Sequence, residues 1–182
     1  MNLGGFPRRT LRGDRAIYRV HKAGQSPWWF SDDGSGRFDP IGTGHGACYF
    51  ADRPIGAWIE VFRKRMLLAE AEVIGRALFT VQLGRDLRLA DVTSRRALQY
   101  GVTASVGAGE SYDASHELAA AALAAGFDGV RYLVRHDPAQ KLHGYALFGP
   151  AGDWPAGTDT RIPDGLVEEA QRLFRYRLLP TP

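Results

Sequence analysis

The stretch Gly36–Phe62, which reads GRFDPIGTGHGACYFADRPIGAWIEVF, constrains the fold of this chain more than any other. It passes from a glycine-rich loop through a short apolar run into a segment whose apolar residues recur at steps of three or four. That spacing predicts an amphipathic helix over residues 54–68, with Asp52 as a possible N-cap and Pro54 near the first helical position. On this helix Glu60 lies beside the apolar stripe, so one carboxylate is expected at the rim of a buried surface.

The rest of the chain alternates between β-rich runs and helical patterns. The expected strands cover residues 16–20, 48–51, 77–83, 87–92, 129–135 and 145–148, and the expected helices cover residues 54–68, 94–98, 115–125 and 164–178. Only a short turn separates the strands at 77–83 and 87–92, so these two are expected to pair or abut. The order of elements predicts an α+β fold with a mixed or mainly antiparallel sheet and flanking helices.

The length of 182 residues suits one domain with its own core. Residues 1–15 are expected to form a flexible leader, and residues 16–182 a single domain with the C-terminal helix, at about 164–178, packed on it. Within this domain, the loop at residues 26–46 is rich in Gly, Asp, Ser and Pro and carries several aromatic residues. A loop of this length inside a compact domain is usually functional or disordered, and the aromatic residues argue against disorder.

Composition and charge exclude several classes of protein. The sequence has no run of about 18 apolar residues and its first residues lack the apolar core of a secretory signal, so a cytoplasmic protein without a membrane anchor is expected. The single cysteine, Cys48, lies in an apolar run and is expected to be buried and inert. The net charge of +3 comes from basic groups without interleaved aromatic residues, which makes direct nucleic-acid binding the last of the interpretations.

The common signatures of metal and hydrolase sites are also missing from the sequence. The five histidines show no HExxH or Cys/His spacing, so no metal site is expected. No GxSxG elbow is present, and the GTGHG segment lacks the lysine of a phosphate-binding P-loop.

Four polar residues remain near the apolar elements: Arg19, Arg37, Tyr49 and Glu60. Arginines can bind a pyrophosphate bidentately, a tyrosine ring can pack on a flat heterocycle, and a carboxylate can stabilise an oxocarbenium-like centre. One carboxylate can suffice if the leaving group departs as a neutral molecule, as nicotinamide does. A salt-bridged edge arginine, a core tyrosine and a helix-rim acid are the alternatives that the residues alone leave open.

At these residues the chain resembles the RES family, whose members are toxins of RES–Xre toxin–antitoxin modules. The matching segments are Ile17–Val20, Gly36–Pro40, Tyr49–Ala51, Ala57–Glu60 and Ala125–Tyr132, in the family's order. The resemblance implies an ADP-ribosyltransferase-like fold and degradation of NAD+ by hydrolysis or phosphorolysis, with NAD+ as substrate and no separate cofactor. It also implies a cognate Xre-like antitoxin as partner, and it allows a homodimer within the toxin–antitoxin complex.

Carried over residue by residue, the resemblance gives each polar residue a role. Arg19 and Arg37 would hold the dinucleotide together with Arg135, and Tyr49 would pack on the nicotinamide side. Glu60 would stabilise the ribosyl cation, so that the catalytic set is Glu60, Tyr49 and Arg19. These residues are expected to converge on one cleft.

One position departs from the family pattern. The family has a serine after its Arg-Tyr pair where this chain has Val134, and strand alternation predicts that Val134 and Tyr132 share a face directed at the pocket. Loss of the hydroxyl is expected to weaken binding by about 1–3 kcal/mol. Two rival functions therefore stay open: a protein ADP-ribosyltransferase, and a degenerate module that binds NAD+ or another nucleotide without turnover.

Overall fold

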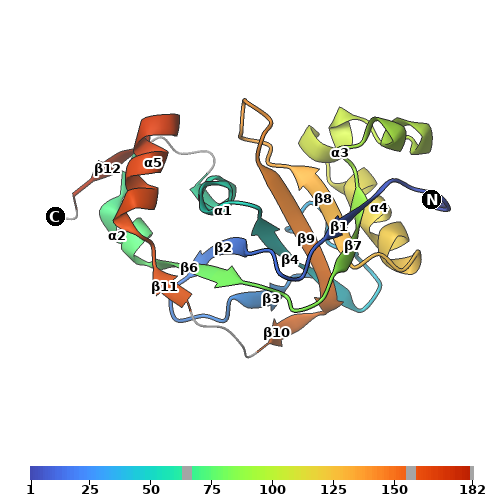
Figure 1. Cartoon of the computed structure of the whole chain (residues 1–182), viewed down its shortest axis with the longest axis horizontal. Coiled ribbons are helices and arrows are strands. Elements are labelled where there is room, and N and C mark those ends of the chain that lie inside the picture. Colours follow the sequence, from blue (N-terminus) through green and yellow to red (C-terminus); the bar gives the residue numbers. More distant parts are fainter. Residues whose placement is uncertain (63–66, 155–158, 181–182) are drawn as a thin grey trace.

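A computed structural model describes residues 1–62, 67–154 and 159–180 of the chain. Its main feature is an eight-stranded mixed sheet in the order β1-β7-β8-β9-β4-β2-β6-β11 (Figure 1). The pairings between these strands are antiparallel except for β7 with β8, which is parallel. The strands of this sheet are β1 Arg8–Leu11, β2 Ile17–Lys22, β4 His45–Ala51, β6 Arg76–Val81, β7 Leu87–Asp91, β8 Gly129–Leu133, β9 His143–Pro150 and β11 Asp159–Arg161.

Two small sheets accompany the main one. β3 (Trp28–Phe30) pairs with β10 (Gly152–Trp154), and β5 (Leu67–Ala69) pairs in parallel with β12 (Arg177–Leu179). The helices are α1 Pro54–Phe62, α2 Glu70–Ile74, the 3-10 helix η1 Arg95–Tyr100, α3 Ala104–Ala108, α4 Asp113–Ala124 and α5 Asp164–Phe174. No helix in the described ranges is both long and apolar enough to cross a bilayer.

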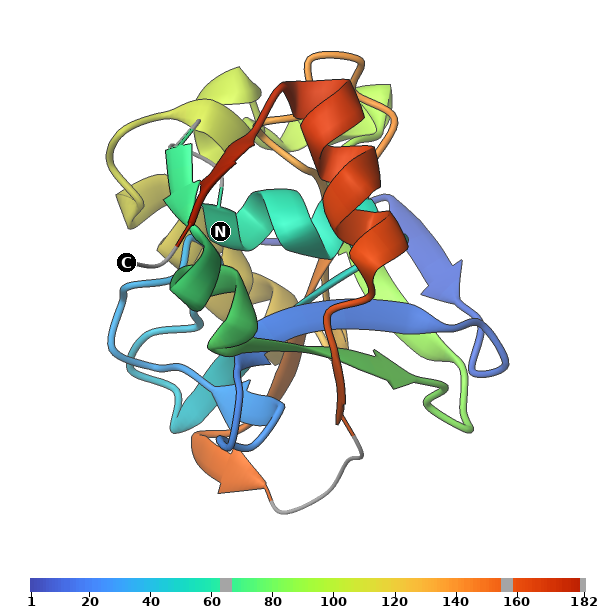
Figure 2. The same cartoon turned by 90° about the vertical axis from the view of Figure 1, so that its left-hand side faces the viewer.

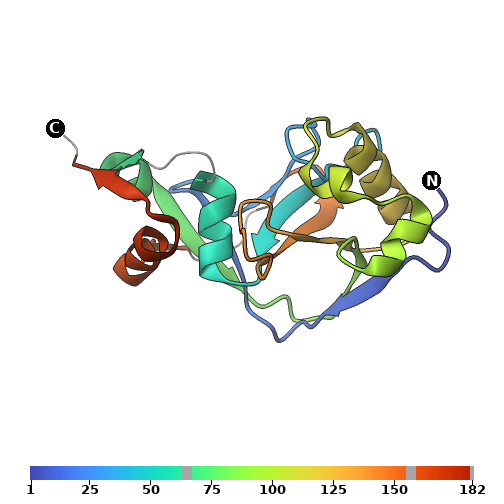
Figure 3. The same cartoon turned by 90° about the horizontal axis from the view of Figure 1, so that it is seen from above.

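The helices form two groups at opposite ends of the sheet. α1, α2 and α5 lie at one end and α3 and α4 at the other, with the β8–β9 hairpin between them (Figure 3). α5 runs beside α1 (Figure 2). Its Leu166 and Ala170 share an apolar cluster with Trp58 and Phe62 of α1. A second cluster lies under α3 and α4, and a third covers the other face of the sheet around Phe50.

The alternation that the sequence predicts for β2 is present in the structure. Ile17 belongs to the cluster around Phe50, whereas Tyr18 and Val20 belong to the cluster under α1. Arg19 therefore shares the face of Ile17. The mixed sheet and the flanking helices confirm the predicted α+β class.

Three expectations about individual elements are wrong. Strands β6 and β7 do not pair, because β6 lies between β2 and β11 while β7 lies between β1 and β8. The helix expected over 54–68 gives way to strand β5 at Leu67, with residues 63–66 outside the described ranges. The last helix ends at Phe174, where Arg175 adopts a left-handed conformation, and residues 177–179 pair with β5 instead of continuing the helix.

The first fifteen residues are not a flexible leader. β1 pairs with β7 at one edge of the sheet, and Leu3, Phe6 and Leu11 are buried. Phe6 packs edge-on against the rings of Tyr100 and Phe127. The predicted leader is wrong because these three apolar side chains anchor the segment to the rest of the domain.

Close backbone approach at Gly46 gives a test of the packing of β3 on β4. A methyl group at Gly46 would overlap with the backbone carbonyl of Phe30, so Gly46→Ala is expected to lower the free energy of unfolding by about 1–3 kcal/mol. Gly165→Ala in α5 is the control, because an added Cβ there meets nothing within 4 Å and alanine favours a helix by up to about 1 kcal/mol. Urea unfolding compares the two variants, and equal effects would contradict this packing.

Candidate active site

The sheet opens beside its centre to form a cavity. β2 and β4 pair at Tyr18 and Ala51, whereas β2 stays paired with β6 along its whole length. A cavity of about 340 Å³ lies where β2 and β4 separate, bounded by α1, the loop after β3 and the segment between α3 and α4. The residues predicted for the site all line this cavity, namely Arg19, Arg37, Tyr49, Glu60 and Arg135. Their predicted convergence on one cleft is therefore present in the structure.

Arg19 spans the gap between the two separating strands. Its Nη1 donates to Sγ of Cys48 at 3.0 Å and to the carbonyl oxygen of Tyr49 at 3.3 Å. Its Nε is buried and has no hydrogen-bond partner among the described residues. Burial raises the pKa of the Cys48 thiol, so the Arg19 guanidinium contacts a neutral sulfur and keeps its positive charge at the cavity wall.

Arg37 is held from the opposite side of the cavity. Its Nη2 donates to the carbonyl oxygen of Gly109 at 2.7 Å, and its Nη1 donates to that of Val106 at 3.4 Å. The guanidinium carbon also lies 4.3 Å from the ring centroid of Tyr112, a cation–π distance. These three contacts fix the position of the Arg37 guanidinium at the cavity.

Tyr49 connects the sheet to the arginine loop through a buried carboxylate that the sequence reasoning missed. Its hydroxyl donates to Oδ1 of Asp39 at 2.7 Å and accepts from the backbone N–H of Phe38 at 2.9 Å. Oδ2 of Asp39 accepts from the N–H of Gly36 at 2.9 Å and from the hydroxyl of Ser31 at 3.2 Å. Tyr49 thus fixes the loop that carries Arg37, in addition to presenting its ring to the cavity.

Burial shifts the ionisation of both members of this pair. It raises the pKa of Tyr49 well above its usual value, and the neighbouring Asp39 carboxylate adds to that effect. Burial also raises the pKa of Asp39, although the hydrogen bond from Tyr49 acts in the opposite direction. The Tyr49 hydroxyl consequently stays protonated at neutral pH and acts as a donor.

Glu60 is the one acidic side chain among the described residues that line the cavity. It lies on α1, where Trp58, Ile59 and Phe62 are buried in the core. Glu60 itself is half-buried, as the predicted position beside the apolar stripe requires. Three arginines and one carboxylate give the cavity wall an excess of positive charge.

The comparisons with known proteins agree with this arrangement. A family model described as the RES domain matches residues 16–163. The chain belongs to the RES domain family. No curated protein matches its sequence.

The structure of this RES domain is similar to a chain in the crystal structure of the M. tuberculosis MbcT–MbcA toxin–antitoxin complex. The TM-score is 0.64 at 18% sequence identity, with 90% of this chain and 92% of that chain covered. At that identity the likeness concerns the fold. It agrees with the predicted α+β class with a mixed sheet.

One site expectation is wrong in this RES domain. Val134 follows the end of β8 at Leu133, and its side chain is 1% exposed in the apolar cluster under α1. Its neighbours Leu133 and Arg135 line the cavity instead, together with Tyr132. Strand alternation does not extend past the end of the strand, so Val134→Ser would place a hydroxyl among apolar side chains and is not expected to raise turnover.

Four further residues of the RES domain contribute to the site without having been predicted. Tyr112, Trp29 and His136 line the cavity, and Asp39 supports it from behind. The GRFDP sequence marked Asp39 only as a turn residue, because aspartate is common in turns. Tyr112 gave no comparable signal, since its contact with Arg37 joins segments far apart in the chain.

Removal of the Tyr49 hydroxyl tests the loop anchor. Tyr49→Phe leaves Asp39 Oδ1 and the N–H of Phe38 without this partner, so the free energy of unfolding should fall by about 1–3 kcal/mol. Tyr100→Phe is the matched control, because the Tyr100 hydroxyl donates a single exposed hydrogen bond to the carbonyl of Gly4. It should cost about 1 kcal/mol or less. Equal losses for the two variants in urea unfolding would show that Asp39 does not depend on Tyr49.

Proposed function

We propose that this RES-domain protein is a toxin that degrades NAD+ by cleaving the bond between nicotinamide and ribose. The observation that carries the proposal is the composition of the cavity lining, which holds Arg19, Arg37 and Arg135 together with a single carboxylate, Glu60. Aromatic side chains of Trp29, Tyr112 and Tyr132 complete the lining. Such a site matches a ligand with an anionic centre and a flat ring at each end.

The arginines supply the charge for a diphosphate. A guanidinium can donate two parallel hydrogen bonds to a phosphate, and hydrogen bonds between charged groups are roughly twice as strong as those between neutral ones. Arg19 and Arg37 are held in place by uncharged atoms of their own protein, such as the carbonyl oxygens of Tyr49 and Gly109. Because these contacts position the side chains in advance, little side-chain freedom is lost when the anion binds.

Glu60 supplies the one negative charge that the reaction needs. When the bond between C1′ of the ribose and the pyridinium nitrogen breaks, both electrons go to that nitrogen and nicotinamide leaves as a neutral molecule. The ribose then carries a positive charge, which a nearby carboxylate stabilises mainly in the transition state. Attack by water gives ADP-ribose and releases a proton, whereas attack by phosphate gives the corresponding phosphate ester.

A second candidate function rests on Val134. The family serine is expected at this position, and here the side chain is apolar and buried. A degenerate module would keep the cavity and bind NAD+ without releasing nicotinamide. A third outcome, transfer of ADP-ribose to a protein, would leave the label on a polypeptide instead of in free ADP-ribose.

The test of the catalytic assignment is Glu60→Gln. Loss of this charge should lower the rate of nicotinamide release by about 10²- to 10³-fold, with NAD+ affinity changed much less. Glu168→Gln on the exposed surface of α5 is the control and should leave the rate unchanged. The purified protein is incubated with NAD+, with and without phosphate, and the products are identified by mass spectrometry. Turnover by Glu60→Gln equal to that of the parent protein would overturn the mechanism.

The proposed partner is an antitoxin protein that blocks the cavity in the cytoplasm. The likeness in fold to a chain of a toxin–antitoxin complex supports this part of the proposal. Expression of the chain alone in bacteria should lower cellular NAD+ and stop growth, and Glu60→Gln should do neither. Growth arrest by both proteins at equal expression would mean that the toxicity does not come from the cavity.

A further inference from the structure

A second cavity adjoins the candidate active site. It has a volume of about 360 Å³ and lies between the η1–α3 segment and the residues that follow β8. The two cavities share four lining residues, Gly107, Tyr132, Leu133 and Arg135. Arg135 is exposed, so an extended ligand can contact this arginine from either cavity.

The second cavity differs from the first in its chemistry. Its aliphatic lining includes Leu98 from η1 and Val102 and Val106 near α3. Leu98 is 63% exposed, so its side chain is accessible to a ligand that enters this cavity. The one acidic lining residue, Asp137, accepts hydrogen bonds from three backbone N–H groups, those of Ala139, Lys141 and Leu142, which fix its position. The basic lining residues are Arg95 and Arg135.

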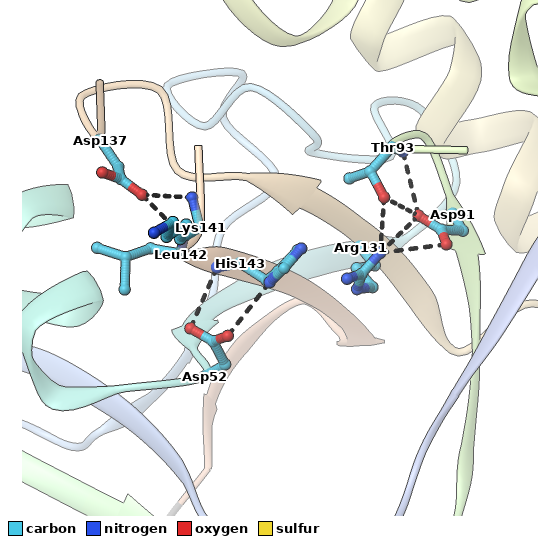
Figure 4. Close-up of polar contacts among 8 residues, drawn as sticks. All are labelled: Asp52, Asp91, Thr93, Arg131, Asp137, Lys141, Leu142 and His143. Carbon is cyan, nitrogen blue, oxygen red and sulfur yellow. Dashed lines mark hydrogen bonds and ion pairs between the residues drawn. The ribbon is translucent and has the colours of Figure 1, made fainter. Parts of the chain in front are cut away.

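Side-chain hydrogen bonds hold two walls of the second cavity in place. Asp137 closes the turn between β8 and β9 through Lys141 and Leu142, as Figure 4 shows. On the other wall, Nη1 of Arg131 donates to both carboxylate oxygens of Asp91, at 3.0 and 3.1 Å, and to the hydroxyl of Thr93, which lines the cavity (Figure 4). A preformed cavity with an apolar wall and a few hydroxyl groups is typical of a site for a flat, uncharged ring.

The geometry of the two cavities limits how a dinucleotide can lie. The reacting nicotinamide ribose must be near Glu60, which lines the first cavity and not the second. The diphosphate would then meet the arginines, among which Arg135 lines both cavities. The adenosine half, which is uncharged apart from its phosphate, is left to occupy the second cavity.

We propose that the second cavity binds the adenosine half of NAD+, with Arg135 contacting the diphosphate at the shared wall. This assignment rests on the function proposed above. It makes Leu98, the exposed leucine of η1, a residue that covers the adenine ring. It also explains how a dinucleotide is accommodated when the first cavity alone has a volume of about 340 Å³.

Calorimetric titration with the two halves of the substrate tests the assignment. Leu98→Asp places a charge at the mouth of the second cavity, and Ala104→Trp, at another exposed lining position, fills it. Each variant should raise the Kd for AMP at least about tenfold and change the Kd for nicotinamide mononucleotide less than about twofold, since tenfold corresponds to about 1.4 kcal/mol. Leu173→Asp on α5 is the matched control, because Leu173 is also an exposed leucine, at 48%, and lies outside both cavities.

The outcomes separate this inference from the proposed function. If the parent protein binds AMP, loses that binding in both variants and yet releases no nicotinamide from NAD+, the adenosine site stands and the proposed function fails. If the protein releases nicotinamide and both variants keep the KM for NAD+ of the parent, the proposed function stands and the adenosine site is overturned. Absence of AMP binding by the parent protein, or unchanged AMP binding in both folded variants, also overturns it.

Discussion

The separation of β2 from β4 is the constraint on which the candidate site depends. The two strands pair at Tyr18 and Ala51 and then diverge. An open sheet would leave backbone polar groups without partners, which is costly when they are buried. Arg19 offsets part of this cost, because its Nη1 donates to the carbonyl oxygen of Tyr49 across the gap. The residue that carries charge into the cavity is thus also a link between the two halves of the sheet.

A second constraint is the burial of Asp39. Its carboxylate is 0% exposed, and such a group is tolerated only when hydrogen bonds replace those of water. Tyr49, Gly36 and Ser31 provide these bonds, and the donors come from β4 and from the loop that holds Arg37. Removal of any of these donors would lower the stability of the fold. The loop conformation that places Arg37 is therefore coupled to the stability of the whole chain.

The sequence predicted the site better than it predicted the order of the strands. Local periodicity was enough to place Arg19 on the face of Ile17 and Glu60 beside the apolar stripe of α1, because both statements concern neighbours in one element. The pairing of β6 with β2, and that of β5 with β12, joins segments that are far apart in the chain, and no local pattern specifies it. Val134 shows the same limit, since its direction depends on where β8 ends.

The N-terminal strand has a consequence for how the limits of this domain are drawn. The match to the RES family begins at residue 16, whereas β1 and the buried side chains of Leu3 and Phe6 precede it. A chain trimmed to the family boundary would uncover the edge of β7 along with the apolar surface around Phe127 that Phe6 covers. An uncovered strand edge beside an apolar patch is a template for intermolecular pairing. The first residue of the family match is therefore not the folding boundary of this domain, and a chain starting at residue 16 would be prone to self-association.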